Sequence, residues 1–211
     1  MDWPYWGQFV SGLVLTLEVT VLAFAGAVIL GLLAVAMRIS RASPLRAAAA
    51  VYVEGVRNVP ALALVFLVVY GLPEIGPSMS LFWSVVIVLA FYEGAFACEA
   101  LRQGVNGVDV KTAEAARALG FTNRQTLRLV VLPQALCNVV QPLTNVFIKT
   151  TLNSSLVAIV GLADLTGVAQ RVNLREAQPL LFVAAGLVYV VIALVGGQIG
   201  GLIERKARIQ R

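Results

Sequence analysis

Long runs of apolar residues constrain this 211-residue chain more than any other feature of its sequence. A helix needs about 20 mostly apolar residues to cross the hydrocarbon core of a bilayer. Runs of that length cover residues 10–37, 50–72, 80–101, 127–150 and 179–203. Only 13% of the residues are charged, against about 25% in soluble domains. The sequence therefore predicts an all-α integral membrane protein with five transmembrane helices, in a single domain over residues 1–211.

The basic residues indicate the orientation of these spans. One side of the predicted bundle carries only Arg171 and Arg175 in its loops. The loops and tail on the other side carry twelve basic residues: Arg38, Arg41, Arg46, Arg102, Lys111, Arg117, Arg124, Arg128, Arg205, Lys206, Arg208 and Arg211. Cytoplasmic loops are enriched in Lys and Arg, so we expect the N-terminus outside the cell and the C-terminus in the cytoplasm. Topology then explains the net charge of +5, and we expect no nucleic-acid partner.

The sequence offers little for catalysis. It has no His, no G-x-x-x-x-G-K-[ST] phosphate loop, and only two cysteines, Cys98 and Cys137, both among apolar residues. The phosphate loop is the element that cradles nucleotide phosphates in P-loop ATPases. We therefore expect that this chain is not an enzyme, hydrolyses no ATP itself and binds no metal or cofactor.

A charged, Ala-rich segment at residues 109–133 interrupts the apolar sequence. Asp109 can cap the start of a helix, and Gly120 stands where the end of that helix calls for a left-handed residue. Thr122 and Gln125 have the capping-box spacing, so a second helix is expected to begin at once and enter the membrane. The pattern predicts a short cytoplasmic helix, a sharp turn at Gly120 and a second helix.

Polar residues recur along the fourth predicted span at steps of three or four residues, which places them on one face of a helix. They are Gln134, Asn138, Gln141, Asn145, Lys149 and Asn153. Such a face should not contact lipid: it either lines a water-filled pathway or forms hydrogen bonds with neighbouring spans. The candidate pathway residues are Asn138, Gln141, Asn145, Lys149, Asn153 and Ser155.

Ionisable residues inside spans are costly and therefore suggest function or pairing. Glu54 and Arg57 stand three residues apart and can pair on one helix face, as can Glu99 and Arg102. Lys149 has three possible partners, which are the carboxylate of a substrate, Glu18 and Glu93.

Small residues predict close helix contacts. Ala27 and Gly31 form a small-xxx-small pair on the first span. The last span has two overlapping GxxxG pairs, which pack either inside the subunit or between subunits: Gly196, Gly197, Gly200 and Gly201. Residues 150–167 are polar and then apolar for too short a run to cross a bilayer, so we expect a re-entrant or surface helix there.

Segment 109–133 resembles the EAA loop of binding-protein-dependent ABC importer permeases, whose pattern is E-A-A, three residues, G, nine residues and I-x-L-P. The matching residues are Glu114, Ala115, Ala116, Gly120, Val130, Leu132 and Pro133, with Val in place of Ile. Other segments resemble the polar-amino-acid branch of that family: TLEVT at 16–20, YVEGVRNVP at 52–60, CEALRQGVNGV at 98–108 and SSLVAIVGLADLT at 154–166. RNVP and EALRQGVN are most similar to glutamate-type permeases.

This resemblance implies the type I ABC importer (MetI-like) permease fold, with a cytoplasmic coupling helix in the loop at residues 103–126. It also implies an ATPase-docking surface formed by Glu114, Ala115, Ala116, Arg117 and Gly120. An alternative role for Glu114 is to stabilise the start of its own helix. The implied partners are ABC ATPase subunits that bind ATP and Mg, a second permease subunit (an identical copy or a relative), an extracytoplasmic substrate-binding protein and membrane lipid.

The function implied by the resemblance is that of a permease subunit for polar amino acids, glutamate or glutamine among them, in a prokaryotic cell (inner) membrane. ATP hydrolysis by the partner would drive alternating access. A passive channel or secondary transporter for small polar solutes would also explain the polar stripe, but not a docking helix. A membrane assembly factor that transports nothing is a third interpretation.

Overall fold

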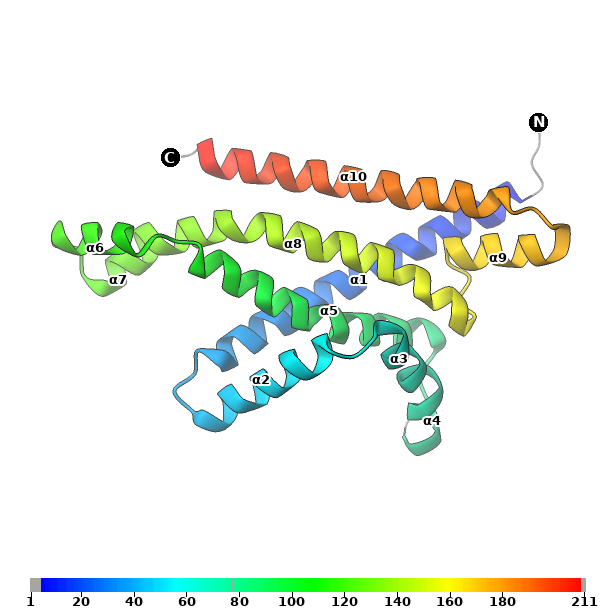
Figure 1. The fold of residues 1–211 in the computed structure, drawn as a ribbon, viewed down its shortest axis with the longest axis horizontal. Coiled ribbons are helices and arrows are strands. Elements are labelled where there is room, and N and C mark those ends of the chain that lie inside the picture. Colours follow the sequence, from blue (N-terminus) through cyan, green and yellow to red (C-terminus); the bar gives the residue numbers. More distant parts are fainter. Residues whose placement is uncertain (1–4, 77, 210–211) are drawn as a thin grey trace.

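The computed structural model describes residues 5–76 and 78–209, and those residues form helices joined by short connections, without strands. Four long helices dominate the fold: α1 (Trp6–Arg38), α5 (Leu81–Asn106), α8 (Leu132–Ser154) and α10 (Leu180–Ile209). Helix α1 packs mainly along α5, α5 along α8, and α8 along α10 (Figure 1). The predicted all-α membrane fold is confirmed, and its first, third and last spans lie close to the predicted positions.

The segment predicted as the second span, residues 50–72, is not one straight helix. Helix α2 (Ser43–Arg57) ends before Pro60, and α3 (Ala61–Phe66) begins after it and continues through η1 (Leu67–Gly71) and α4 (Leu72–Ile75). The two halves are bent by 106°. Proline lacks an N–H and disfavours helical geometry in the residue before it, so Pro60 explains the break. The predicted second span is therefore broken at Pro60 and not straight; among the described residues, four helices can cross alone and the bent pair would be the fifth crossing.

The fourth span is longer than predicted. It starts at α7 (Asn123–Gln125), passes through a π-helical segment, η2 (Thr126–Val131), and continues through α8 into a 3-10 segment, η3 (Ser155–Val160). Gly161 then turns the chain with a φ of 94°, and α9 (Leu165–Glu176) follows. The first half of the expected re-entrant segment at 150–167 is therefore the end of the fourth span, and the separate short helix begins later, at Leu165.

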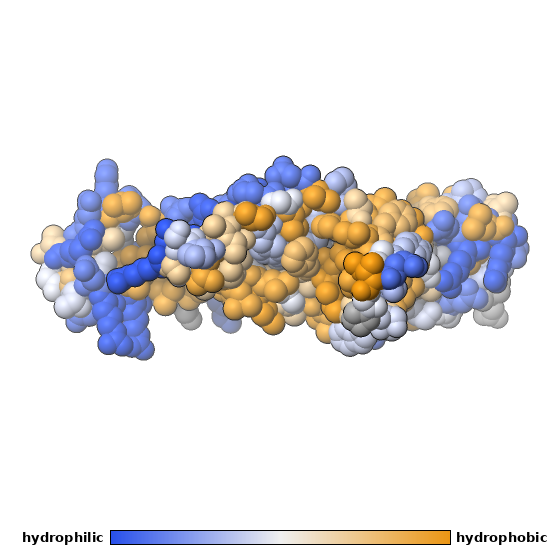
Figure 2. All heavy atoms as spheres, turned by 90° about the horizontal axis from the view of Figure 1, so that it is seen from below, coloured by the Kyte–Doolittle hydropathy of each residue, from blue (hydrophilic) through white to orange (hydrophobic). Residues whose placement is uncertain are grey.

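The loops that carry most of the basic residues gather at one end of the molecule. Figure 1 shows α6 (Val110–Ala118), α7, the α1–α2 connection and the C-terminal end of α10 at one end of the long axis, and α9 at the other. Figure 2 shows hydrophobic residues over the middle of one face and hydrophilic residues towards both ends. This distribution agrees with a membrane-spanning middle and two polar ends.

Glycine and alanine allow the closest helix contacts. Ala27 is fully buried, and a Cβ added at Gly31 would lie 2.8 Å from the Cβ of Ala97 on α5. The predicted small face on the first span is therefore confirmed. On α10, Gly196 and Gly200 pack against Phe147 and Thr144 of α8, whereas a Cβ at Gly201 would have no neighbour within 4 Å. One glycine pair thus packs inside the subunit.

A first prediction concerns this α1–α5 contact. Gly31→Ala is expected to lower the free energy of unfolding by about 1–3 kcal/mol, because the new methyl group would also lie 2.9 Å from the backbone N of Cys98, which cannot move aside easily. Thermal unfolding of the purified protein in detergent measures this. Gly55→Ala is the matched control: its Cβ would meet open space, so Ala should stabilise α2 by about 0.5–1 kcal/mol. Equal effects of the two substitutions would contradict the account.

Candidate functional site

The predicted cytoplasmic helix has the shape expected from its capping signals. The backbone N of Lys111 donates to Asp109 Oδ1 at 2.9 Å at the start of α6, and Gly120 turns the chain with a φ of 87°. Thr122 and Gln125 form a complete capping box at the start of α7: Thr122 N donates to Gln125 Oε1 at 2.8 Å, and Gln125 N donates to Thr122 Oγ1 at 3.3 Å. These predictions are confirmed.

Helix α6 presents most of the predicted docking residues to its surroundings. Glu114, Ala115, Arg117 and Gly120 are exposed, whereas Ala116 is buried. The structure adds Leu119, which is 79% exposed although it is apolar, and Val110, which is 68% exposed. Sequence reasoning missed both, although an exposed leucine beside the helix end is typical of a contact surface. The surface at residues 110–120 therefore combines charged, small and apolar groups.

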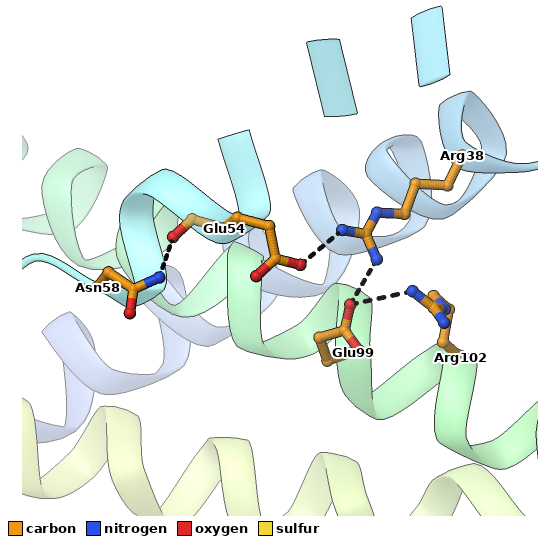
Figure 3. Close-up of polar contacts among 5 residues, drawn as sticks. All are labelled: Arg38, Glu54, Asn58, Glu99 and Arg102. Atoms are coloured by element: carbon orange, nitrogen blue, oxygen red, sulfur yellow. Dashed lines mark hydrogen bonds and ion pairs between the residues drawn. The ribbon is translucent and has the colours of Figure 1, made fainter. Parts of the chain in front are cut away.

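An ion-pair network joins α1, α2 and α5 (Figure 3). Arg38 Nη1 donates to Glu99 Oε1 at 2.7 Å, and Arg38 Nη2 donates to Glu54 Oε1 at 3.1 Å. Arg102 Nη1 also reaches Glu99 Oε1, at 3.4 Å, which confirms the predicted pair on α5. The prediction that Glu54 pairs with Arg57 is wrong. Glu54 instead pairs with Arg38, which is close in space but distant in sequence.

Arg57 and Lys149 both lie against Phe96. The Cζ atom of Arg57 is 5.6 Å from the centroid of the Phe96 ring, and the Nζ atom of Lys149 is 3.9 Å from it. Of the open alternatives for Lys149, neither Glu18 nor Glu93 forms an ion pair with it in the described part of the chain. The structure thus brings together two cations that the sequence analysis treated separately.

The polar stripe on the fourth span divides between a cavity and helix contacts. Asn145 and Lys149 line a cavity of about 160 Å³ together with Arg57, Phe96, Glu99, Ala100, Gln103, Pro142 and Val146. Asn153 instead faces α5, where its Nδ2 donates to Glu93 Oε1 at 2.6 Å. Asn153 therefore forms a helix contact, while the pathway interpretation of Asn145 and Lys149 stays a prediction.

The remaining predicted pathway residues lie outside this cavity. Asn138 lies beside Gly107, whose added Cβ would be 3.3 Å from Asn138 Nδ2. Gln141 is exposed on α8, and Ser155 Oγ donates within its own segment to the carbonyl of Leu152 at 2.7 Å. Glu93 is fully buried, and its Oε2 has no hydrogen-bond partner among the described residues.

A second polar cluster, which the sequence analysis missed, fixes α9 to α1 and α10. Asp164 caps α9 by accepting from Gly167 N at 2.8 Å, and its Oδ2 accepts from the Tyr189 hydroxyl at 2.9 Å. Leu165 N donates to Thr16 Oγ1 on α1 at 3.0 Å. The pKa of the Asp164 carboxyl is raised above its ordinary value, because the effect of burial exceeds the opposite effect of the hydrogen bonds from Gly167 and Tyr189.

A second prediction follows from this cluster. Tyr189→Phe should lower the free energy of unfolding by about 1–3 kcal/mol, because it leaves a carboxylate oxygen of fully buried Asp164 without a donor. The measurement is thermal unfolding in detergent. Tyr70→Phe, at a tyrosine that is 54% exposed, should change stability by less than about 0.5 kcal/mol. A loss of similar size at both positions would show that the hydroxyl of Tyr189 has no special role.

Comparison with known proteins places this arrangement in a family. Residues 9–209 match the family described as binding-protein-dependent transport system inner membrane component. The chain belongs to this family. It is 37% identical to the probable glutamine ABC transporter permease protein GlnM of Bacillus subtilis, over 75% of this chain and 73% of that protein.

Solved structures agree with this family assignment. The structure resembles a chain in the crystal structure of an amino acid ABC transporter with histidines, with a TM-score of 0.89 and 33% identity over 96% of this chain and 95% of that one. An inward-facing structure of the MetNI methionine ABC transporter superposes with a TM-score of 0.80 at 21% identity, over 98% of this chain and 99% of that one. The chain has the type I ABC importer (MetI-like) permease fold.

Proposed function

We propose that this chain is the permease subunit of an ATP-driven ABC importer for polar amino acids, glutamate or glutamine among them. The observation that carries the proposal is the exposed EAA surface on α6, at the polar end of a fold shared with ABC importer permeases. One relative is a probable glutamine transporter permease, and one structural neighbour is an amino acid transporter with histidines, which supports amino acids as the class of solute.

The direct connection between α6 and the fourth span supports a coupling role. The capping box at Thr122 and Gln125 joins the turn after α6 to a continuous helical segment, Asn123–Val160, which carries Asn145 and Lys149. A displacement of α6 by an ATPase subunit would therefore move one wall of the cavity. Because ATP binds the closed and open states of its ATPase with different affinity, it can shift the permease between inward-facing and outward-facing states.

The other subunits supply what this chain lacks. ATP is bound with Mg and hydrolysed in the ATPase subunits, which dock on the exposed residues Glu114, Ala115, Arg117 and Gly120. Ala116 is buried and supports this surface from inside the chain. A second permease subunit, either identical or related, completes the pathway, to which this chain contributes Asn145 and Lys149. An extracytoplasmic binding protein delivers the solute, and the N-terminus lies on its side of the inner membrane with the C-terminus in the cytoplasm.

Co-purification tests the docking part of this proposal. A tagged permease extracted from the native membrane is expected to retain an ATPase with Walker motifs, in a complex that survives gel filtration. A passive channel or secondary transporter would be recovered without such an ATPase. Recovery of the permease alone, under conditions in which it remains folded, would contradict the proposal.

A further inference from the structure

Two cations that face one aromatic ring are the least expected feature of the spans. Arg57 comes from the end of α2 and Lys149 from α8, and both lie against Phe96 of α5, at 5.6 Å and 3.9 Å from the ring centroid. Within the described residues neither forms an ion pair. Both line the cavity of about 160 Å³, beside the side-chain amides of Gln103 and Asn145.

Glu99 also lines this cavity, but it and the other acidic residues nearby already accept hydrogen bonds within the chain. Glu99 Oε1 accepts from Arg38 at 2.7 Å and from Arg102 at 3.4 Å, and Glu54 accepts from Arg38 at 3.1 Å. Glu93 is fully buried and accepts from Asn153. Two arginines and two carboxylates therefore balance within the ion-pair network. Glu93 is a further acid, and its charge interacts with that of Lys149 although the two form no ion pair among the described residues.

This leaves excess positive charge at the cavity. Arg57 and Lys149 are both exposed on this single chain, so each faces water, lipid or a partner subunit. A cation in a membrane span is costly unless it meets an anion or faces water. The face of an aromatic ring attracts a cation, but by only about 0.5–2 kcal/mol, and Phe96 serves two of them at once. An anion that entered the cavity would neutralise this excess positive charge.

We propose that Arg57 and Lys149 form a binding site for a carboxylate of the transported solute, and that this site favours acidic amino acids over cationic ones. The planar guanidinium of Arg57 can bind a carboxylate through two parallel hydrogen bonds, and Lys149 adds a point charge. The amide groups of Asn145 and Gln103 can donate further hydrogen bonds. This inference rests on the proposed function, because it takes the cavity to be part of a solute pathway.

The carboxylate has two possible sources, the α-carboxylate common to all amino acids and the side-chain carboxylate of an acidic one. Comparison of glutamate with glutamine separates them, because only glutamate has a side-chain carboxylate and glutamine has a neutral amide in its place. The second part of the proposal is tested with arginine, whose cationic side chain the site should repel.

The experiment measures dissociation constants of glutamate, glutamine and arginine for the purified permease–ATPase complex, without the binding protein. Arg57→Gln and Lys149→Gln are each expected to raise the Kd for glutamate about tenfold or more, as for the loss of a hydrogen bond to a charged group. Arg57→Lys, which keeps the charge, should raise it less. Arg41→Gln is the control, since Arg41 is exposed in the α1–α2 connection and does not line the cavity.

If the Gln variants raise the Kd for glutamate alone, the result supports the site and shows that it binds the side-chain carboxylate. If they raise the Kd for glutamine equally, the result supports the site and shows that it binds the α-carboxylate. The proposal is overturned if the wild-type complex binds arginine as tightly as glutamate, if it binds no glutamate, or if both folded Gln variants keep the wild-type Kd. Failure of the proposed function is a separate result: the complete wild-type transporter would then show no ATP-dependent uptake of any amino acid.

Discussion

Glu99→Ala is expected to lower the free energy of unfolding by about 2–3 kcal/mol, the largest effect among the single substitutions considered for the ion-pair network. Glu99 is the acceptor for both Arg38 and Arg102, and its side chain is only 20% exposed. Removing it leaves Arg38, which is 13% exposed, with Glu54 as its one remaining acidic partner. Chemical unfolding of the purified permease in detergent measures the loss.

The matched control is Glu54→Gln. Glu54 is 62% exposed, so water screens its pair with Arg38, and exposed pairs contribute at most about 1 kcal/mol. The double variant should lose less than the sum of the single losses, because both carboxylates act on the same guanidinium. Losses of equal size for Glu99→Ala and Glu54→Gln would show that burial does not govern the strength of this network.

Glu114→Lys is expected to weaken binding of the ATPase about tenfold or more and to reduce ATP-dependent transport accordingly. The substitution reverses a charge on the exposed face of α6, where the described residues give Glu114 no hydrogen bond or ion pair. Asp109 caps this helix, so α6 should still form and the permease should still insert. The measurement is the affinity of the ATPase for the purified variant.

Glu74→Lys serves as the control for the Glu114→Lys prediction, because Glu74 is another exposed acidic residue and lies on α4, away from α6 in the sequence. It should leave the affinity of the ATPase unchanged. If Glu114→Lys also binds the ATPase normally but is less stable to heat, Glu114 stabilises its helix and does not dock. That outcome would favour the alternative role for this residue.

Local signals explain which parts of the fold were predictable. Asp109, Gly120 and the Thr122–Gln125 box act on their own segment, and the structure confirms the shape they predict. The broken second span was also within reach, because Pro60 lies inside the apolar run at 50–72. A count of apolar residues ignores the missing N–H of proline, and this is why the break in the second span was not predicted.

Contacts between distant segments could not be predicted in the same way. Spacing rules consider neighbours three or four residues away, so they paired Glu54 with Arg57 and did not find Arg38. Likewise the stripe on α8 placed Lys149 on the correct face but did not show that Phe96 and Arg57 lie opposite it. These arrangements depend on how α1, α2 and α5 pack. That packing joins residues far apart in the sequence, so no local spacing pattern predicts it.

ATP-dependent uptake tests the central claim most directly. The permease is reconstituted into liposomes with its ATPase and permease partner subunits, and the binding protein and radiolabelled glutamate or glutamine are supplied on its extracytoplasmic side. The account predicts accumulation that requires ATP and continues after ionophores have removed all ion gradients. Uptake that persists without ATP and stops when an ion gradient is removed would contradict it and identify a secondary transporter.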